Sequence, residues 1–576
     1  KIDNTDYIYK QIIKPEVEQV KERLQYTYFD LRGFQAQIND EAIIEKRKFI
    51  ALYKFLSPTH LLRVPYAFDH NKLNKSFYRE LLYIMGEEEM KDKNTGKIEI
   101  KRLRKNKQEY SLLEQVIAKL EDYDIGNDNE VFDVALGLVL TWINRILFLK
   151  LLEAQLISFN GANTKKFLCT KRVSDYDVLH DLFMKVLAKP IEERSDIIKQ
   201  QFSDVPYLNS SLFELSTFEK QYFPISGIRM GGMELLSSTV LKDEKGKKRI
   251  GQIQVLEYLF SFLDAYDFGT NSHNDNSPIR TESKTIINAA VLGLIFEKIN
   301  GYKDGSFFTP GFITEYICRK TLRRVVVDKF NEIKKWECQD FEELKELIDY
   351  RKREVRIEAN SIINELKICD PAVGSGHFLV SALNELIAIK SELGILQDTS
   401  TEPKRILDYD ITIEDDELVM ANEDGEQFCY DPSNVSSQRI QQTLFEEKRI
   451  IIENCLFGVD LNPKSVEICR LRLWIELLKN AYFYRSETGE RVLQTLPNID
   501  INIKCGNSLA SNHPVCINRK IQSLSGMKSL VLDYKNNVKE YKRCNSKATK
   551  QAISKNIDAL KRKLNPPVQL EMFKRN

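Results

Sequence analysis

A short apolar segment that breaks into a glycine-containing turn and continues as a helix constrains this chain more than any other feature. It reads Lys367-Ile-Cys-Asp-Pro-Ala-Val-Gly-Ser-Gly-His-Phe-Leu-Val380. A strand is predicted to end at Cys369, and residues 378–390 are predicted to form the helix. The small residues of the turn, 370–376, let the backbone approach a ligand closely. The segment therefore predicts a nucleotide-cofactor site.

Two later strands strengthen this hypothesis, because the turn alone is also compatible with an ordinary strand-to-helix connection. A dinucleotide fingerprint would have a third glycine where Leu379 stands. Residues 455–459 are apolar and precede Asp460, and residues 499–503 alternate in polarity and precede Asn507. Since the carboxyl ends of parallel strands meet at one edge of a sheet, the turn and these polar residues should gather there, where such folds bind ligands.

Residues 391–447 interrupt the alternation of strand and helix, and they are predicted to be an insertion. Within them, residues 411–420 and 427–430 are predicted to pair as a β-hairpin around a turn at residues 422–425. Removing the insertion restores a doubly wound α/β pattern. It also accounts for the spacing of 84 positions from the last turn glycine, Gly376, to Asp460, where about 20 are usual.

The N-terminal half is predicted to be mainly helical, and residues 1–275 are interpreted as a connector or scaffold domain. Residues 17–24 and 112–120 show apolar spacing of three and four. Residues 138–159 are apolar but contain three charged side chains, which favours a buried helix over a membrane span. No signal peptide or membrane segment is predicted.

The remaining chain is divided into three parts by composition. Residues 276–350 are predicted to be a helical lead-in that carries the Phe-Thr-Pro motif described below. Residues 351–510 are predicted to form the cofactor-binding core, with the inserted hairpin. Residues 511–576 are rich in lysine and are predicted to be a helical insertion.

Charge and cysteine content exclude some classes of protein. The 85 basic and 84 acidic side chains exclude a globally basic nucleic-acid coat but allow a local basic face. The ten cysteines are spaced singly, which indicates no zinc site and no disulfide framework and favours the cytoplasm. No other metal site is predicted.

A Glu-x-Lys pattern at residues 99–101 resembles part of a metal-dependent nuclease site. Asn94-Thr-Gly96 precedes it as a hairpin turn would, so solvated strand faces are the simpler interpretation. Lys101-Arg-Leu-Arg-Lys-Asn-Lys107 could contact phosphates or be a solvated surface.

Four motifs together resemble the S-adenosylmethionine-binding motifs of gamma-class adenine-N6 DNA methyltransferases. They are Gly305-Ser-Phe-Phe-Thr-Pro310, Asp370-Pro-Ala-Val-Gly-Ser-Gly-His-Phe-Leu379, Phe457-Gly-Val-Asp-Leu-Asn-Pro463 and Gly506-Asn-Ser-Leu509. Within that class the chain is most similar to the methylase part of type IIG restriction-modification enzymes, over residues 140–560. The resemblance implies a Rossmann-like class I methyltransferase domain preceded by a large mainly α-helical domain.

The resemblance also implies roles for individual residues in holding S-adenosyl-L-methionine. Phe308, Thr309 and Pro310 are expected to pack against the methionine moiety, and Asp370 is expected to hold its amino group. The residues expected to line the cofactor are Pro371, Ala372, Gly374 and Gly376. Asp460 and Leu461 are expected on the ribose side, and Asn507 is expected to face the adenine. Two alternatives stay open. Thr309 and Pro310 could simply begin a helix, and Asp460 could cap the helix that starts near Pro463.

The catalytic loop of this family, Asn-Pro-Pro-aromatic, is not identified in the sequence. Asn565-Pro566-Pro567 is followed by a valine, and the interpretation favoured is a helix-ending turn rather than a catalytic site. The catalytic residues are therefore left unassigned. The loop and a target-recognition domain are expected beyond Asn576, and a nuclease domain before Lys1.

The implied function is site-specific methylation of adenine N6 in double-stranded DNA, with endonuclease activity in the full-length protein. The chain alone is expected to be inactive. Three alternatives remain: a phage-defence DNA methyltransferase without a nuclease, a non-catalytic DNA-binding scaffold, and a nucleotide-dependent oxidoreductase. The oxidoreductase is disfavoured by Leu379.

Overall fold

The computed structural model describes most of the chain beyond residue 73. The described residues are 14, 74–91, 98–104, 107–160, 166–208, 211–268, 287, 289–301, 309, 311–398, 409–414, 417–422, 427–485, 489, 491–509, 524–544 and 547–564. Residues 69–422 and 427–576 group into one compact unit, and the following description concerns that unit. The predicted helix at residues 17–24 and the predicted boundary near residue 270 lie outside the described residues.

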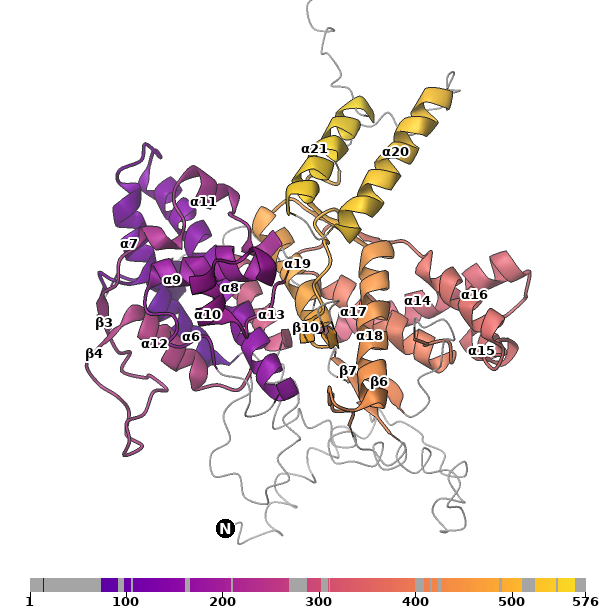
Figure 1. Ribbon diagram of the computed structural model, residues 1–576, viewed down its shortest axis with the longest axis horizontal. Coiled ribbons are helices and arrows are strands. Elements are labelled where there is room, and N and C mark those ends of the chain that lie inside the picture. Colours follow the sequence, from indigo (N-terminus) through magenta and orange to yellow (C-terminus); the bar gives the residue numbers. More distant parts are fainter. Residues whose placement is uncertain are drawn as a thin grey trace, which may run out of the picture. The chain divides into compact units, whose positions relative to one another are not determined.

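Residues 74–268 are mainly helical, as predicted (Figure 1). The elements are α6 (Lys75–Met85), β1 (Glu87–Lys91), β2 (Ile98–Arg102), α7 (Leu112–Leu120), α8 (Asp128–Asn160), α9 (Tyr176–Asp181), the π-helix η4 (Leu182–Leu187), the 3-10 helices η5 (Ile191–Glu193), η6 (Ser211–Phe213) and η7 (Ile225–Gly227), α10 (Asp196–Phe202), α11 (Thr217–Gln221), β3 (Gly232–Glu234), β4 (Gln252–Gln254) and α12 (Val255–Asp264).

Residues 289–564 alternate between helices and short strands. The elements are α13 (Ala289–Gly301), α14 (Gly311–Lys334), α15 (Phe341–Leu347), α16 (Arg353–Asn364), β5 (Ile368–Asp370), α17 (His377–Glu392), β6 (Asp410–Glu414), β7 (Glu417–Ala421), α18 (Val435–Asn454), β8 (Leu456–Asp460), α19 (Pro463–Leu478), β9 (Phe483–Arg485), β10 (Arg491–Leu493), β11 (Ile503–Cys505), α20 (Leu524–Arg543) and α21 (Lys547–Leu564).

A parallel sheet of three strands carries the predicted cofactor motifs. The strand order is β11-β8-β5, and both neighbouring pairs are parallel. Leu456 at the start of β8 is fully buried, as a strand covered on both faces requires. Helix α17 follows β5 and α19 follows β8, and the two helices pack on each other. All three strands therefore end at the same edge.

Two β-hairpins were predicted, and the structure confirms one and corrects the other. β1 pairs antiparallel with β2, as expected around residues 94–96. In the insertion, β6 pairs antiparallel with β7, so the chain already reverses after Glu414, inside the predicted first strand. The predicted pairing across residues 422–425 is confirmed in part, because Ala421 forms an antiparallel bridge with Gln427 and the Phe428 N–H donates to the Met420 carbonyl at 2.9 Å. The predicted strand at residues 411–420 was wrong because it contains both strands of the hairpin.

The predicted strand at residues 499–503 was also wrong, since the third strand begins only at Ile503. Its alternating polar residues do not face solvent. The Asn502 amide is buried and donates hydrogen bonds of 2.8–3.0 Å to the carbonyls of Ile452, Glu453 and Leu456. The backbone N–H of Asn502 donates to the Ile499 carbonyl, so the chain makes a turn before the strand. The Asn502 side chain therefore holds the end of α18 against the sheet and does not face solvent.

The long helix α8 forms the centre of the helical part. By length and composition, its residues 128–159 could span a membrane, but 89% of the apolar window is buried inside the protein. Arg145 projects from α8 and forms two hydrogen bonds, of 2.7 and 2.8 Å, with the Glu219 carboxylate of α11. Both side chains are almost completely buried, at 1% and 0% exposure. Trp142 donates to the same carboxylate.

Glu219→Ala should destabilise the protein by about 3–5 kcal/mol, because the substitution leaves a buried guanidinium without its counter-charge. Burial raises the pKa of Glu219, but the Arg145 charge and hydrogen bonds outweigh it and lower that pKa overall. The stabilisation should therefore be present above the unfolded pKa and be lost as pH falls through the lower folded value. Urea denaturation at neutral and acidic pH measures both effects.

Glu193→Ala is the control for this prediction, since Glu193 is an exposed carboxylate of η5. We expect it to change stability by no more than about 0.5 kcal/mol. Equal effects of the two substitutions would contradict the role given to the buried ion pair.

Candidate cofactor site

The carboxyl ends of β5 and β8 are joined by the side chain of Asp460. Its Oδ2 accepts a hydrogen bond of 2.8 Å from the Gly374 N–H in the turn, and its Oδ1 accepts one of 2.8 Å from the Asn462 N–H. The Gly506 N–H after β11 donates to the Asp460 carbonyl at 2.8 Å. The three predicted strand ends are thus brought together, as the sequence indicated.

Asp460 is not the cap of α19, which was one of the two interpretations left open. That place is taken by Asn462, whose side chain accepts from the Lys464 N–H at 2.9 Å. Asp460 instead shapes the turn against β8. Its predicted contact with a ribose stays a prediction.

Gly376 stands where the turn becomes α17, in a conformation and a space that favour glycine. Its φ is +87°, a backbone conformation that L side chains rarely adopt. A Cβ at this position would lie 2.7 Å from the Sγ of Cys469 in α19. The glycine therefore allows both the turn and the close packing of α17 on α19.

A cluster of buried polar side chains forms hydrogen bonds with the turn. The Glu297 carboxylate of α13 accepts hydrogen bonds from the Ser375 hydroxyl and the His377 ring. Arg472 of α19 lies 3.3 Å from Glu297 and 3.2 Å from the Nδ1 of His377. Because an arginine only donates, Nδ1 accepts and the proton of His377 is on Nε2, facing Glu297.

This cluster was not predicted from the sequence. Its members come from three distant segments, and no local spacing connects Glu297 of the lead-in helix to Arg472 of α19. His377 alone, in the first turn of a helix, gave no sign of a partner. All four side chains are at least nine-tenths buried, so they support the site from inside and do not face a ligand.

Asp370, at the end of β5, has the character expected of a group that receives a cation. Burial raises its pKa, the Ala372 N–H lowers it, and the negative charge of Asp460 adds to the rise. The Ala372 N–H donates to it at 3.0 Å. Within the described part of the chain no basic side chain pairs with it. Two neighbouring carboxylates without a counter-charge favour a positively charged ligand group.

Some of the other predicted cofactor residues follow the strand ends directly, and others lie elsewhere or outside the described residues. Pro371 and Ala372 are exposed, and Thr309 is half-buried at the start of α14. Leu461 follows β8 and is 72% exposed. Phe308 and Pro310 lie outside the described residues, as do Asn565, Pro566 and Pro567.

Asn507 lies in the loop after β11, and its side chain is partly used within that loop. Its Oδ1 accepts a hydrogen bond of 3.0 Å from the Leu509 N–H. An amide oxygen can accept twice, so the predicted contact with an adenine amino group stays a prediction. Leu509 itself is 94% exposed. Together with Leu461 it offers apolar surface beside the strand ends.

Comparisons with known proteins give the same assignment for this part of the chain. Residues 347–534 match the family described as MmeI, DNA-methyltransferase domain. Residues 1–69 and 70–287 match two families described as domains of unknown function, DUF7149 and DUF7814.

One curated relative is the "Putative type II restriction enzyme and methyltransferase RM.MjaORFECS2P" of Methanocaldococcus jannaschii. It is 30% identical over 389 residues, which are 64% of this chain and 27% of the relative. The chain thus spans about a quarter of that protein's length. These matches confirm the predicted resemblance to the methylase part of restriction-modification enzymes.

A solved structure of the type IIL restriction-modification enzyme MmeI in complex with DNA is also similar. The identity is 14% and the TM-score 0.34, over 69% of this chain and 40% of that one. A similarity of this size does not define a common fold.

Gly376→Ala should destabilise the protein more than an alanine at another glycine of positive φ. Gly246→Ala is the matched control, because Gly246 has a φ of +74° and no atom within 4 Å of a built Cβ. Backbone strain should cost about 1–2 kcal/mol in both variants. Crowding against Cys469 should add about 1–3 kcal/mol at residue 376 alone. Urea midpoints that are equal for the two variants would contradict this account of the turn.

Proposed function

We propose that residues 351–510 bind S-adenosyl-L-methionine at the carboxyl edge of β5, β8 and β11. We further propose that the intact protein is a type IIG restriction-modification enzyme. It would methylate adenine N6 at specific sites in double-stranded DNA, act in the cytoplasm and also cut DNA. The observation that carries the cofactor assignment is the Asp370 and Asp460 pair beside a turn that only glycine permits.

The residues at this edge fit such a cofactor chemically. S-adenosylmethionine has a positively charged amino group, and Asp370 has no cation among the described residues. At Gly374, which is half-buried, no Cβ stands between the backbone and a ligand, whereas Gly376 serves the packing of α17 on α19. Leu461 and Leu509 are exposed leucines, and they are suited to cover the faces of an adenine ring. The matching family, a DNA-methyltransferase domain, requires a methyl donor.

The open edge of the sheet supports a doubly wound Rossmann-like fold. Among the described strands, β5 has a neighbour on one side only. Cys369 of β5 is exposed. In the first two turns of α14, Phe312 and Tyr316 are 74% and 64% exposed. In doubly wound sheets the first strand is central. We therefore propose that further strands, together with the catalytic loop, pair with β5 in the intact protein.

When bound, the cofactor supplies a methyl group that is already activated by the sulfonium. The task left to the protein is to place donor and acceptor in line. Asp370 and the turn would fix the donor from one side. The adenine would be flipped out of the duplex and held by an Asn-Pro-Pro-aromatic loop, as the family resemblance implies. No residue described here is assigned to that loop.

Calorimetric titration of S-adenosylmethionine tests the cofactor site. Asp370→Asn keeps the shape and the acceptor for the Ala372 N–H but removes the charge. We expect it to weaken binding roughly tenfold or more, since a charge-assisted hydrogen bond is lost. Asp122→Asn, at an exposed carboxylate far from the strand ends in sequence, should bind like the unaltered protein.

The titration should be repeated with a chain extended past residue 576, where binding should be tighter. Absence of binding in both the chain and its extended form would overturn the proposed function. Equal binding by the unaltered protein and Asp370→Asn would overturn the role of Asp370 alone.

Asp370→Asn should also make the free protein slightly more stable at neutral pH. The folded pKa of Asp370 is raised, so the carboxylate costs stability as pH rises through the unfolded pKa toward the folded one. The substitution should remove this loss, by at most about 1 kcal/mol because the group is partly exposed. Thermal denaturation at pH 4 and pH 7.5 measures it. If Asp370→Asn were less stable than the unaltered protein at pH 7.5, the ionised Asp370 carboxylate would not lower the stability of the folded protein as argued here.

A further inference from the structure

Helices α20 and α21 concentrate positive charge that the chain as a whole does not have. They lie side by side as a helical hairpin (Figure 1). They contain eleven lysines and arginines and three acidic residues, a balance of +8. The whole chain has a formal charge of +1, so the rest of it is net acidic, at −7.

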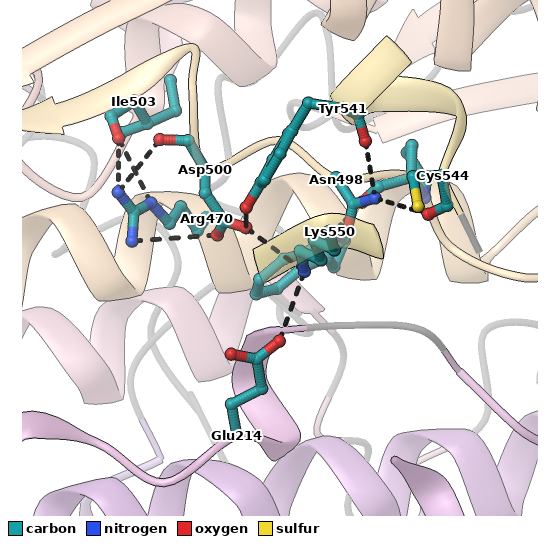
Figure 2. A network of polar contacts seen from close by, with 10 residues as sticks. Glu214, Arg470, Asn498, Asp500, Ile503, Tyr541, Cys544 and Lys550 are labelled. Atoms are coloured by element: carbon teal, nitrogen blue, oxygen red, sulfur yellow. Dashed lines mark hydrogen bonds and ion pairs between the residues drawn. The ribbon is translucent and has the colours of Figure 1, made fainter. Parts of the chain in front are cut away.

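The pair is held firmly at the end where its two helices meet (Figure 2). The Asn498 amide donates to the carbonyls of Tyr541 and Cys544, at 3.1 Å each. Lys550 lies 3.7 Å from the Asp500 carboxylate and 3.4 Å from that of Glu214, in the helical part of the chain. The buried lysine thus fixes the direction of the hairpin against two parts of the molecule.

The small apolar core between α20 and α21 lies close to the start of the third strand of the sheet. Ile501 packs against the small core between the helices, which is formed by Tyr541, Ile553 and Ile557. Burial, together with the positive charges of Lys561 and Arg470, lowers the pKa of Lys504 in β11 to about 8. Lys504 is three residues before Asn507. The packing of Ile501 and the effect of the Lys561 charge on Lys504 therefore place α21 near β11, the strand that leads to Asn507.

Several cations of the hairpin are open to solvent. Arg562 and Lys563 are exposed, and among the described residues Lys561 pairs with Asp558, at 3.3 Å, in a largely exposed contact. Nearer the junction of the two helices, Lys535 and Lys539 are exposed on α20, four residues apart and so on one face. Several positive charges on one rigid helical hairpin favour the binding of a polyanion, because a polyanion can neutralise several of them at once.

We propose that α20 and α21 form a phosphate-binding arm, in which Lys561, Arg562 and Lys563 contact the backbone of duplex DNA beside the cofactor edge. The proposal rests on the proposed function for its partner, since a methylated base must lie near this edge. The arm would give affinity and position but no sequence preference, because phosphates carry no sequence information. The structure thereby separates positioning on DNA from the reading of bases.

Fluorescence anisotropy with a labelled duplex of arbitrary sequence, over a range of salt concentrations, tests the arm. The variant Lys561→Gln/Arg562→Gln/Lys563→Gln removes three charges and keeps helix-forming residues. We expect its affinity to fall by roughly tenfold or more. The slope of log Kd against log salt concentration should become shallower by about 2–3, because each phosphate contact contributes about 0.9.

The control is Lys245→Gln/Lys247→Gln/Lys248→Gln, which removes the same charge from exposed lysines of a turn before β4. It should change neither affinity nor slope. Circular dichroism of both variants checks that the helices remain. Equal losses in the two triple variants, an unchanged salt slope in the arm variant, or no duplex binding by the unaltered protein would each overturn the arm. Tighter binding to single-stranded RNA than to duplex DNA would overturn its assignment to duplex DNA.

The failure of the arm can be distinguished from that of the proposed function by titrating S-adenosylmethionine into the same proteins. The arm variant should bind the cofactor like the unaltered chain, since none of its three residues touches the turn. DNA binding that depends on the arm without any cofactor binding would refute the methyltransferase and leave the arm in place.

Discussion

The hydrogen bonds of Asp460 are the contacts on which the proposed site depends most. A strand ending in a free carboxylate would leave the glycine turn of β5 without a fixed position, because glycines restrict the backbone least. By accepting from the Gly374 N–H, Asp460 converts a permissive segment into one conformation. Burial raises the pKa of Asp370, and the charge of this same carboxylate adds to the rise. One side chain therefore both shapes the turn and makes the site acidic.

Buried charges elsewhere connect segments that the backbone alone would leave independent. Glu297 ties the lead-in helix to the turn and to α19 through Arg472. Lys550 does the same between the arm and the helical part. A buried ion pair adds little net stability compared with a hydrophobic contact, but breaking it is costly. Such pairs thus specify which surfaces meet, which matters in a chain assembled from several helical segments.

The sequence predicted the parts of this fold that depend on local patterns. Each of the three strands ends with the expected polar group nearby, and α7 coincides with the predicted 112–120. Prediction was wrong where a polar residue served a distant partner. Asn502 alternates with isoleucines as a surface strand residue would, yet it binds the carbonyls at the end of α18. The cluster around Glu297 was missed for the same reason, since its members are far apart in sequence.

The register of the inserted hairpin shows another limit. Residues 411–420 were interpreted as one strand, although four consecutive acidic residues, 414–417, interrupt them. The asparagine and glycine of residues 422–425 gave the stronger turn signal, and Ala421 does bridge Gln427 across that turn. The earlier reversal inside the predicted strand was missed, and the pairing of β6 with β7 shows it. Only cross-strand contacts distinguish these arrangements.

Charge at the edge of the sheet is divided between two signs, and the division follows the order of the strands. The carboxylates of Asp370 and Asp460 end β5 and β8, whereas Lys504 and the end of α21 accompany β11. A small cationic ligand and a large anionic one can then approach the same edge without competing for one surface. Each charged group also discourages the wrong ligand, since like charges repel most strongly where water is scarce. A near-neutral chain can thus direct a polyanion to one face, which its total charge of +1 would not suggest.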